Sequence, residues 1–257
     1  MNAATDATDM IRAPFALAIL LLFSGCQDAD RTPPTDDVPT EPSATATEAT
    51  GATPDVPNEA DAVEAAQEDT YTVVFFGDSL TAGYGLADPE AEAYPALIGD
   101  RLRQRGIDAR VINAGSSGET TAGGLRRVDW VLGRTTPDVF VLALGGNDML
   151  RGQPPAATKQ NLEATLAKVR ESAPDAILVV AGMEALANYG QEYRDDYREV
   201  FREVAEDFDA AFIPFLLEGV GGVPELNQAD GVHPTAEGQR IMAATVWDAL
   251  APLVREG

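Results

Sequence analysis

Three side chains in this sequence have the types and the spacing that a serine nucleophile requires. Ser79 stands in the stretch GDSLTAGYG, directly after an apolar run at residues 72–76. His233 is the only histidine in the chain, and Asp230 precedes it by three residues in ADGVHPTAEG. A nucleophilic serine needs a base that takes its proton and a third group that orients that base. The three residues together predict a catalytic triad, whereas each of them alone would suit a strand end, a structural histidine or a turn.

Ser79 belongs to one of three polar segments that each follow an apolar run. The run at residues 72–76 leads into GDSLTAGYG, the run at 109–113 into AGSSGET, and the run at 139–144 into LGGNDMLRG. Such near-continuous apolar runs are typical of parallel strands buried on both faces. Because the carboxyl ends of neighbouring parallel strands meet at one edge of a sheet, we expect the three polar segments to lie side by side.

The elements that must position these segments alternate along the chain. Two more apolar runs, at residues 176–182 and 210–214, complete a set of five predicted strands. Segments with apolar residues at spacings of three and four predict helices between and after them. These segments are residues 94–106, 120–134, 157–173, 193–208 and 235–254. The alternation predicts an α/β fold, a doubly wound sandwich with helices on both faces of a mainly parallel five-stranded sheet.

Four segments of the chain together resemble the four ordered blocks of one enzyme family. GDSLTAGYG, NAGSSGET, GGNDMLRG and DGVHPTAEG follow one another as in the SGNH, or GDSL-type, hydrolases. The likeness is greatest to the branch of bacterial thioesterase I, lysophospholipase and arylesterase enzymes, and it extends from about Val73 into the last predicted helix. It implies the SGNH hydrolase fold, which is a flavodoxin-like doubly wound sandwich, and an enzyme that hydrolyses ester bonds.

The resemblance also implies roles for individual residues. Ser79 would be the nucleophile, with Asp230 and His233 as its partners. The backbone N–H of Ser79, together with Gly118 and Asn147, would supply the donors of an oxyanion hole. A glycine lets the backbone approach an oxyanion without a Cβ in the way, and an asparagine offers a neutral N–H donor.

The stretch EALANYG after the fourth predicted strand is a candidate for substrate binding. We expect Leu186, Ala187 and Tyr189 to wall an acyl pocket, with packing inside the loop as the alternative. For Asp78 and Asp148, which each adjoin a predicted site residue, the expected role is to anchor turns and loops by hydrogen bonds.

The charge of the chain argues against a nucleic-acid partner. The formal net charge is −24 at pH 7, and residues 71–257 alone carry 28 acidic against 16 basic side chains. Contacts to phosphates require a basic face. One histidine, one cysteine and the absence of a Walker or dinucleotide glycine motif in the sequence disfavour a metal or an organic cofactor. We therefore expect no cofactor, and a small acyl-ester or lipid-like substrate as the partner.

The first 70 residues predict export and attachment to a membrane. Residues 1–26 contain an apolar run at 15–23 that suits a secretory signal peptide, and they end at Cys26, the only cysteine. This pattern resembles a bacterial lipoprotein signal, in which that cysteine is lipidated. Residues 27–70 hold 12 acidic side chains against one arginine and predict a disordered tether to a hydrolase domain at 71–257. We expect a cell-envelope protein anchored in the outer membrane and facing the periplasm, or a secreted one if Cys26 is not lipidated.

Together these features predict a serine esterase. It would hydrolyse carboxylic ester or thioester bonds of acyl substrates through an acyl-enzyme intermediate, as arylesterases, lysophospholipases and thioesterases do. Two alternatives stay open: a carbohydrate O-deacetylase, because the same family includes such enzymes, and a cell-surface lipoprotein that binds ligands without turnover. The joint presence of Ser79, Asn147, Asp230 and His233 argues against the second, because binding alone does not require the whole set.

Overall fold

The structure, a computed structural model, describes residues 71–254, so Cys26, the predicted signal peptide and the predicted tether lie outside the described residues. Its centre is a sheet of five strands in the order β2-β1-β3-β4-β5, and every neighbouring pair is parallel. The strands are β1 (Tyr71–Gly77), β2 (Ala109–Gly115), β3 (Val139–Ala143), β4 (Ile177–Ala181) and β5 (Ala211–Ile213). The predicted doubly wound, flavodoxin-like fold is thus confirmed.

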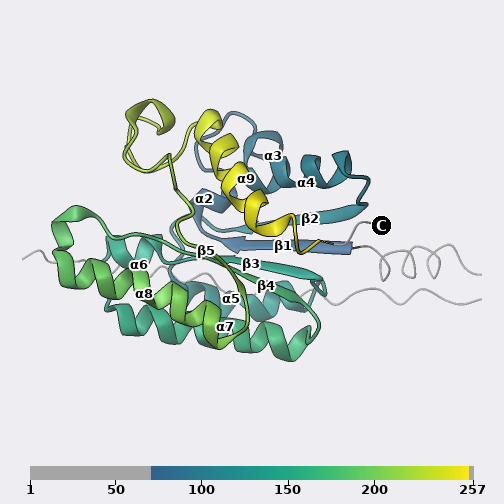
Figure 1. The fold of residues 1–257 in the computed structure, drawn as a ribbon, viewed down its shortest axis with the longest axis horizontal. Coiled ribbons are helices and arrows are strands. Elements are labelled where there is room, and N and C mark those ends of the chain that lie inside the picture. Colours follow the sequence, from purple (N-terminus) through teal and green to yellow (C-terminus); the bar gives the residue numbers. More distant parts are fainter. Residues whose placement is uncertain (1–70, 255–257) are drawn as a thin grey trace, which may run out of the picture. The chain divides into compact units, whose positions relative to one another are not determined.

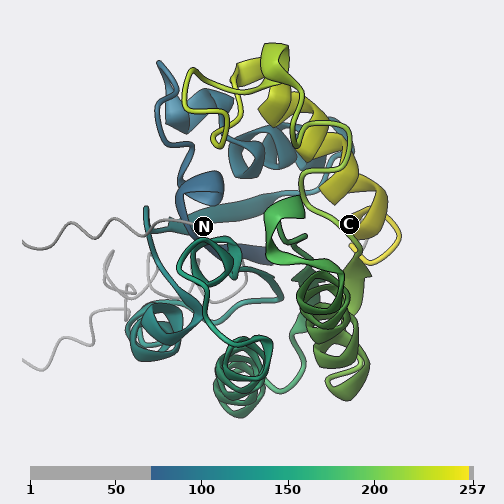
Figure 2. The same ribbon diagram turned by 90° about the vertical axis from the view of Figure 1, so that its left-hand side faces the viewer.

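Helices cover both faces of the sheet (Figure 1). One layer consists of α2 (Ser79–Ala82), α3 (Pro89–Glu92), α4 (Tyr94–Gln104) and α9 (Ala236–Leu250). The other consists of α5 (Thr121–Leu132), α6 (Gly146–Leu150), α7 (Pro155–Ser172) and α8 (Gln191–Asp207). Two 3₁₀ turns, η1 (Ala187–Tyr189) and η2 (Pro224–Leu226), lie in the loops after β4 and β5. Figure 2 looks at both layers from the end at which the strands finish.

The five long helices occupy the positions that the sequence predicts. The short helices α2, α3 and α6 are not among the predicted ones, because four or five residues complete too few turns to show an apolar period. Among the helices of residues 71–254, none has both the length and the apolarity that crossing a membrane requires.

Side chains of β1 pack on both faces of the sheet. Phe75 meets Tyr94 of α4 edge-to-face, with ring centroids 5.5 Å apart. The adjacent Phe76 packs against Phe140 of β3, and the guanidinium of Arg127 from α5 lies 4.2 Å from its ring. Successive residues of a strand point to opposite faces, so β1 is packed between the two helical layers. This packing on both faces fixes the position of the end of β1, from which the segment with Ser79 begins.

Strand β2 differs from the expectation that the strands are buried on both faces. Arg110 and Asn113 of β2 are exposed, whereas every residue of β3 is buried. β2 lies at the edge of the sheet and pairs only with β1, and the helical layers cover the centre of the sheet more fully than its border. The apolar run predicted a strand correctly, but its place in the sheet depends on how the whole chain pairs.

Candidate active site

Ser79 lies where β1 ends and α2 begins. β1 finishes at Gly77, and Asp78 caps α2 by accepting a hydrogen bond from the backbone N–H of Leu80 at 3.0 Å. Such a cap satisfies one of the N–H groups that the first helical turn leaves without a partner. Ser79 is the first residue of α2 and lines a cavity at the end of the sheet. The polar segment after the first strand is therefore a short helix rather than an open loop.

The three residues of the predicted triad form a continuous series of hydrogen bonds. Nε2 of His233 lies 2.9 Å from Oγ of Ser79, and Nδ1 of His233 lies 2.7 Å from Oδ2 of Asp230. An ionised carboxylate can only accept, so the network assigns the proton to Nδ1 and leaves Nε2 to accept from the serine hydroxyl. A general base for the serine needs this tautomer. Folding thus brings together side chains that are 154 residues apart.

The carboxylate of Asp230 is kept ionised by its own loop. Its Oδ1 accepts from the backbone N–H groups of Val232 at 2.9 Å and His233 at 3.0 Å. The bond from the His233 backbone, then the bond from the imidazole, and then the bond from Val232 hold the pKa of the Asp230 carboxyl well below its usual range. A carboxylate that stays charged stabilises the positive imidazole that forms when His233 takes up a proton.

The loop that carries Asp230 and His233 is tied to the segment after α2. Nε2 of Gln228 donates to the carbonyl oxygens of Tyr84 at 2.7 Å and of Pro234 at 3.1 Å. The ring of Tyr84 lies 4.7 Å from the His233 ring, measured between centroids. Gln228 is a positioning residue that the sequence analysis missed, since no local pattern pairs a glutamine with a carbonyl 144 residues away.

Gly118 and Asn147 border the same cavity as Ser79. Gly118 has a φ of 76°, in the left-handed region that favours glycine. A Cβ added there would meet only the end of the Arg151 side chain, at 3.9 Å. The backbone conformation is therefore one reason for this glycine, and the close approach to an oxyanion expected from the sequence stays a prediction.

Asn147 is oriented by Asp78. It is the second residue of α6, and its Nδ2 donates to Oδ2 of Asp78 at 3.1 Å. A carboxamide nitrogen has two hydrogens, so the second one is free to donate to a substrate oxygen. Gly145, whose φ of 133° is difficult for other residues, makes the turn that leads into α6.

The carboxyl group of Asp78 is buried. Burial raises its pKa from 3.8 to about 6, against the opposing effect of the hydrogen bonds from Leu80 and Asn147. Asp78 was expected to anchor a turn, and its bond to the backbone N–H of Leu80 does this. The bond to Asn147 was missed, because it joins residues 69 positions apart.

Side chains from α8 and the loop before it hold the segment that contains Asn147. Three phenol hydroxyls donate to carbonyl oxygens of residues 145–153, and the three rings stack with centroids 4.9 and 5.6 Å apart. Asp148 adds two bonds as an acceptor, from the N–H and the hydroxyl of Thr121, in line with the anchoring role expected for it. The phenol bonds join Tyr197 to Gly145 at 2.6 Å, Tyr189 to Met149 at 2.6 Å and Tyr193 to Gln153 at 2.8 Å.

The cavity beside Ser79 has a volume of about 670 Å³ and walls that are largely apolar. Leu186 and Ala187 belong to its lining, where the sequence analysis placed them. Tyr189 does not, because its hydroxyl binds the Met149 carbonyl and its ring stacks on Tyr193. Tyr189 therefore has the packing role that was the alternative for it. The apolar lining residues are Leu80, Tyr84, Met149, Leu150, Met183, Ala185, Leu186, Ala187, Phe215, Leu217 and Val232.

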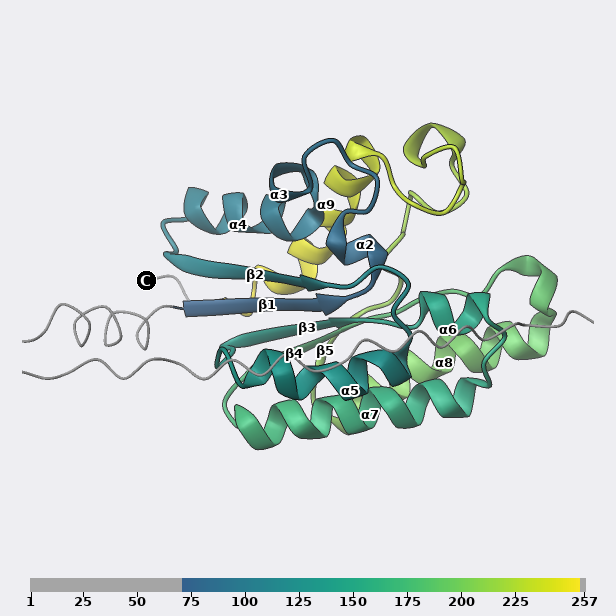
Figure 3. The ribbon, with the colours of Figure 1, turned by 180° about the vertical axis from the view of Figure 1, so that it is seen from behind.

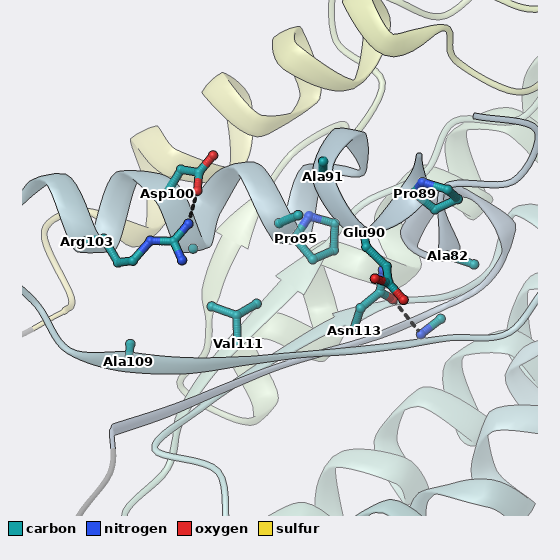
Figure 4. A pocket seen from close by; sticks show the side chains of 13 residues that line it. Ala82, Pro89, Glu90, Ala91, Pro95, Asp100, Arg103, Ala109, Val111 and Asn113 are labelled. Atoms are coloured by element: carbon teal, nitrogen blue, oxygen red, sulfur yellow. Dashed lines mark hydrogen bonds and ion pairs between the residues drawn. The ribbon is translucent and has the colours of Figure 1, made fainter. Parts of the chain in front are cut away.

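A second cavity, of about 700 Å³, lies between α4 and β2 (Figure 4). Asp100 and Arg103 pair with each other at its border, and Asn113 binds the Gly115 N–H and the Thr81 carbonyl. Asp100, Arg103 and Asn113 therefore already have partners within the protein. In residues 71–254, no three His, Cys, Asp or Glu side chains are grouped as metal ligands would be.

The pairing of Asp78 with Asn147 predicts opposite effects of Asp78→Asn on activity and stability. The new amide can still cap α2, but it has one acceptor oxygen where the carboxylate has two, and its NH₂ faces another donor. We expect Asn147 to shift and kcat to fall about tenfold, less than the hundred- to thousand-fold loss that follows removal of an oxyanion donor.

The stability effect of Asp78→Asn should depend on pH. The Asp78 carboxyl has a pKa of about 6 in the folded protein and 3.8 in the unfolded chain. As pH rises from about 4 to 6, the unfolded chain releases this proton before the folded protein does, so the free energy of unfolding falls. The cost above pH 6 is about 3 kcal/mol for a shift of this size. Thermal unfolding should show the variant to be more stable than the wild type at pH 8 and not at pH 3.5. A gain that is equal at both pH values would contradict this prediction, and the exposed Asp175→Asn serves as the control.

Comparison with known proteins agrees with this arrangement. Residues 75–241 match the GDSL-like Lipase/Acylhydrolase family. Over 183 residues the chain is 40% identical to Esterase TesA of Pseudomonas aeruginosa. This match covers 71% of this chain and 89% of TesA. It is 35% identical over 184 residues to the Arylesterase of Vibrio mimicus, with 72% and 90% covered. It is 34% identical over 183 residues to Thioesterase 1/protease 1/lysophospholipase L1 of Escherichia coli, with 71% and 85% covered.

Solved structures show the same fold. The crystal structure of TesA matches with a TM-score of 0.67 and 40% identity, and it covers 71% of this chain and 99% of that chain. AlinE4, an SGNH-hydrolase family esterase, matches with a TM-score of 0.59 and 40% identity, covering 73% and 98%. The resemblance seen in the four sequence blocks is therefore confirmed. By its sequence match, its relatives and its fold, this chain belongs to the GDSL-like lipase/acylhydrolase family.

Proposed function

We propose that this ester hydrolase uses Ser79, His233 and Asp230 as a catalytic triad and forms an acyl-enzyme on Ser79. The observation that carries the proposal is the unbroken series of hydrogen bonds from the serine Oγ through both imidazole nitrogens to the carboxylate. The relatives named esterase, arylesterase and thioesterase support carboxylic esters and thioesters of acyl groups as substrates. The largely apolar cavity supports the same class, since it suits an acyl chain.

In the first half of the reaction, Oγ of Ser79 attacks the carbonyl carbon of the ester and Nε2 of His233 takes the hydroxyl proton. The carbonyl oxygen becomes an oxyanion, which the backbone N–H groups of Ser79 and Gly118 and the second N–H of Asn147 stabilise. The bond to the leaving alcohol or thiol then breaks, and His233 returns its proton to the leaving group. An acyl group remains on Ser79.

The second half repeats these steps with water. His233 takes a proton from water, whose oxygen attacks the acyl carbon, and the same donors stabilise the second oxyanion. The bond to Oγ of Ser79 breaks, Oγ receives the proton from His233, and a carboxylic acid leaves. Asp230 stays ionised throughout and stabilises the charged imidazole in both halves.

Covalent labelling tests the proposal directly. A fluorophosphonate reacts with an activated serine nucleophile, losing fluoride and forming one phosphonyl bond to Oγ. We expect one label per chain, located on Ser79 by peptide mass spectrometry, and loss of p-nitrophenyl butyrate hydrolysis in proportion to the label. Heat-denatured protein is the control and should take up no label. A fully labelled protein that keeps its activity, or a label on another serine, would contradict the assignment.

The two alternatives have less support. A carbohydrate O-deacetylase must bind sugar hydroxyls, but the cavity next to Ser79 is lined mainly by aliphatic, methionine and aromatic side chains. A binding protein without turnover needs neither the correct histidine tautomer nor an ionised Asp230 at the imidazole. The relatives with the identities given above are named as esterases or thioesterases.

For the location of the enzyme, we propose a lipid anchor at Cys26 and attachment to the outer membrane, facing the periplasm. The support is sequence alone: an apolar run at residues 15–23 that lies shortly before Cys26, the only cysteine, followed by the acidic residues 27–70. Mass spectrometry of protein extracted from membranes tests this proposal, and an unmodified Cys26 in the mature chain would contradict it.

A further inference from the structure

Exposed apolar side chains gather at the mouth of the active-site cavity. In residues 71–254, five large hydrophobic side chains are strongly exposed, and all of them except Trp130 line the cavity that contains Ser79. Single exposed apolar residues are common on protein surfaces, but a group of them indicates a contact surface. The four at the cavity, here called the apolar rim, are Tyr84 (54% exposed), Leu150 (47%), Leu186 (51%) and Val232 (41%).

The apolar rim is built from four separate segments. Tyr84 follows α2 and Leu150 ends α6, and these helices lie at the same end of the sheet in opposite layers (Figure 3). Leu186 comes after β4, just before η1, and Val232 stands in the loop before α9. Each of the four segments therefore exposes one large apolar side chain beside a single cavity, although the segments are far apart in sequence.

Charges of both signs lie beside the apolar rim: Arg151, which follows Leu150, donates to the carbonyl oxygen of Gly118 in the cavity lining. Among the described residues that line the cavity, Asp78, Glu184 and Asp230 carry carboxyl groups, and none is a lysine or arginine. Glu184 and Asp230 are partly exposed, although Arg198 pairs with Glu184 from outside the lining. An anionic lipid surface would repel the domain as a whole, because residues 71–257 carry 28 acidic against 16 basic side chains. A zwitterionic surface has no net charge and would not repel it.

We infer that the apolar rim docks the enzyme onto the surface of aggregated zwitterionic lipid, with the cavity mouth turned towards that surface. The inference rests on the proposed function and narrows its substrates to amphiphiles whose acyl chains reside in such a surface. Leu150, Leu186 and Val232 lose contact with water on docking, and the Tyr84 ring, apolar with a polar tip, suits the interface. An acyl ester then passes from the lipid into the cavity without crossing water.

Vesicle binding tests the inference with the full chain. Cys26→Ser, which cannot be lipidated at this position, is the parent, so that all variants are compared without a lipid anchor. Leu150→Ser with Leu186→Ser should lower the partition coefficient into phosphatidylcholine vesicles about fivefold or more, since two apolar contacts are lost. Trp130→Ser is the matched control: it removes an equally exposed side chain from α5, away from the cavity, and should change the partition coefficient less than about twofold.

Lipid charge provides a second comparison. The parent should bind phosphatidylglycerol vesicles about fivefold more weakly than phosphatidylcholine vesicles at low salt, because the domain carries a net negative charge. Circular dichroism and thermal unfolding show whether each variant is folded. If the variant with two serines is not folded, Leu150→Ala with Leu186→Ala takes its place. Equal partitioning of the rim variant and the parent, or a preference for phosphatidylglycerol, would overturn the inference.

Two further outcomes separate this inference from others. If the parent associates with itself in the absence of lipid and the rim variant does not, the rim belongs to a contact between two copies of the chain and the inference is wrong. Hydrolysis of water-soluble p-nitrophenyl acetate by the parent tests the proposed function alone. Hydrolysis without rim-dependent binding overturns the docking surface only, whereas rim-dependent binding without hydrolysis supports the docking surface and overturns the proposed function.

Discussion

Ser79→Ala should lower kcat by about 10⁴-fold or more and leave the protein folded. The serine Oγ is the atom that bonds to the acyl carbon, and a methyl group cannot replace it. The hydroxyl makes one hydrogen bond to a side chain, at 2.9 Å to Nε2 of His233. Losing a bond of this kind costs about 1 kcal/mol, which changes the unfolding temperature by only a few degrees.

Steady-state kinetics with p-nitrophenyl butyrate and a thermal unfolding curve measure both effects of Ser79→Ala. The control is Ser172→Ala at the exposed end of α7, which should have wild-type activity. A Ser79→Ala variant that retains a tenth of the wild-type kcat would show that Ser79 is not the nucleophile. A variant that has lost its cooperative unfolding transition would show that the serine has a structural role.

His233→Ala should lower kcat by a similar factor, about 10⁴-fold or more, because the serine then has no base. Asp230 keeps its bond from the backbone N–H of Val232, so the loop should stay in place. The double variant Ser79→Ala with His233→Ala should be about as inactive as either single variant, since nucleophile and base act as one unit. If the two losses in kcat multiply instead, the residues act independently and the triad assignment fails.

The pH dependence adds a separate check on His233. A protonated imidazole cannot take the serine proton, so kcat/KM should fall on the acid side as the ring takes up one proton. His233 is the only histidine, so its ring signals can be followed by NMR without ambiguity. Burial raises the pKa of Asp78 to about 6, so its carboxyl is a second group that would give an acid limb, and Asp78→Asn removes that titration. An acid limb that disappears in Asp78→Asn would assign the limb to Asp78 and contradict the role of His233.

Much of the fold could be predicted from the sequence because its signals are local. The run at residues 139–144 is apolar throughout and correctly predicted a buried strand. Apolar residues spaced three and four positions apart correctly predicted the long helices. The placement of three polar segments at one edge follows from the direction of parallel strands. The residues of the triad could be named for another local reason: a single histidine, with an aspartate three positions before it, left little choice of base.

Only the tertiary structure decided which side chains meet and how deeply they are buried. The bond between Asp78 and Asn147, the burial that raises the pKa of Asp78, and the position of Tyr189 outside the cavity all depend on segments that are distant in the chain. The apolar rim likewise exists only because four segments that are distant in the chain meet beside one cavity. A local pattern reports the environment that a residue prefers, whereas its neighbours and its contact with water are set by the packing of the whole chain.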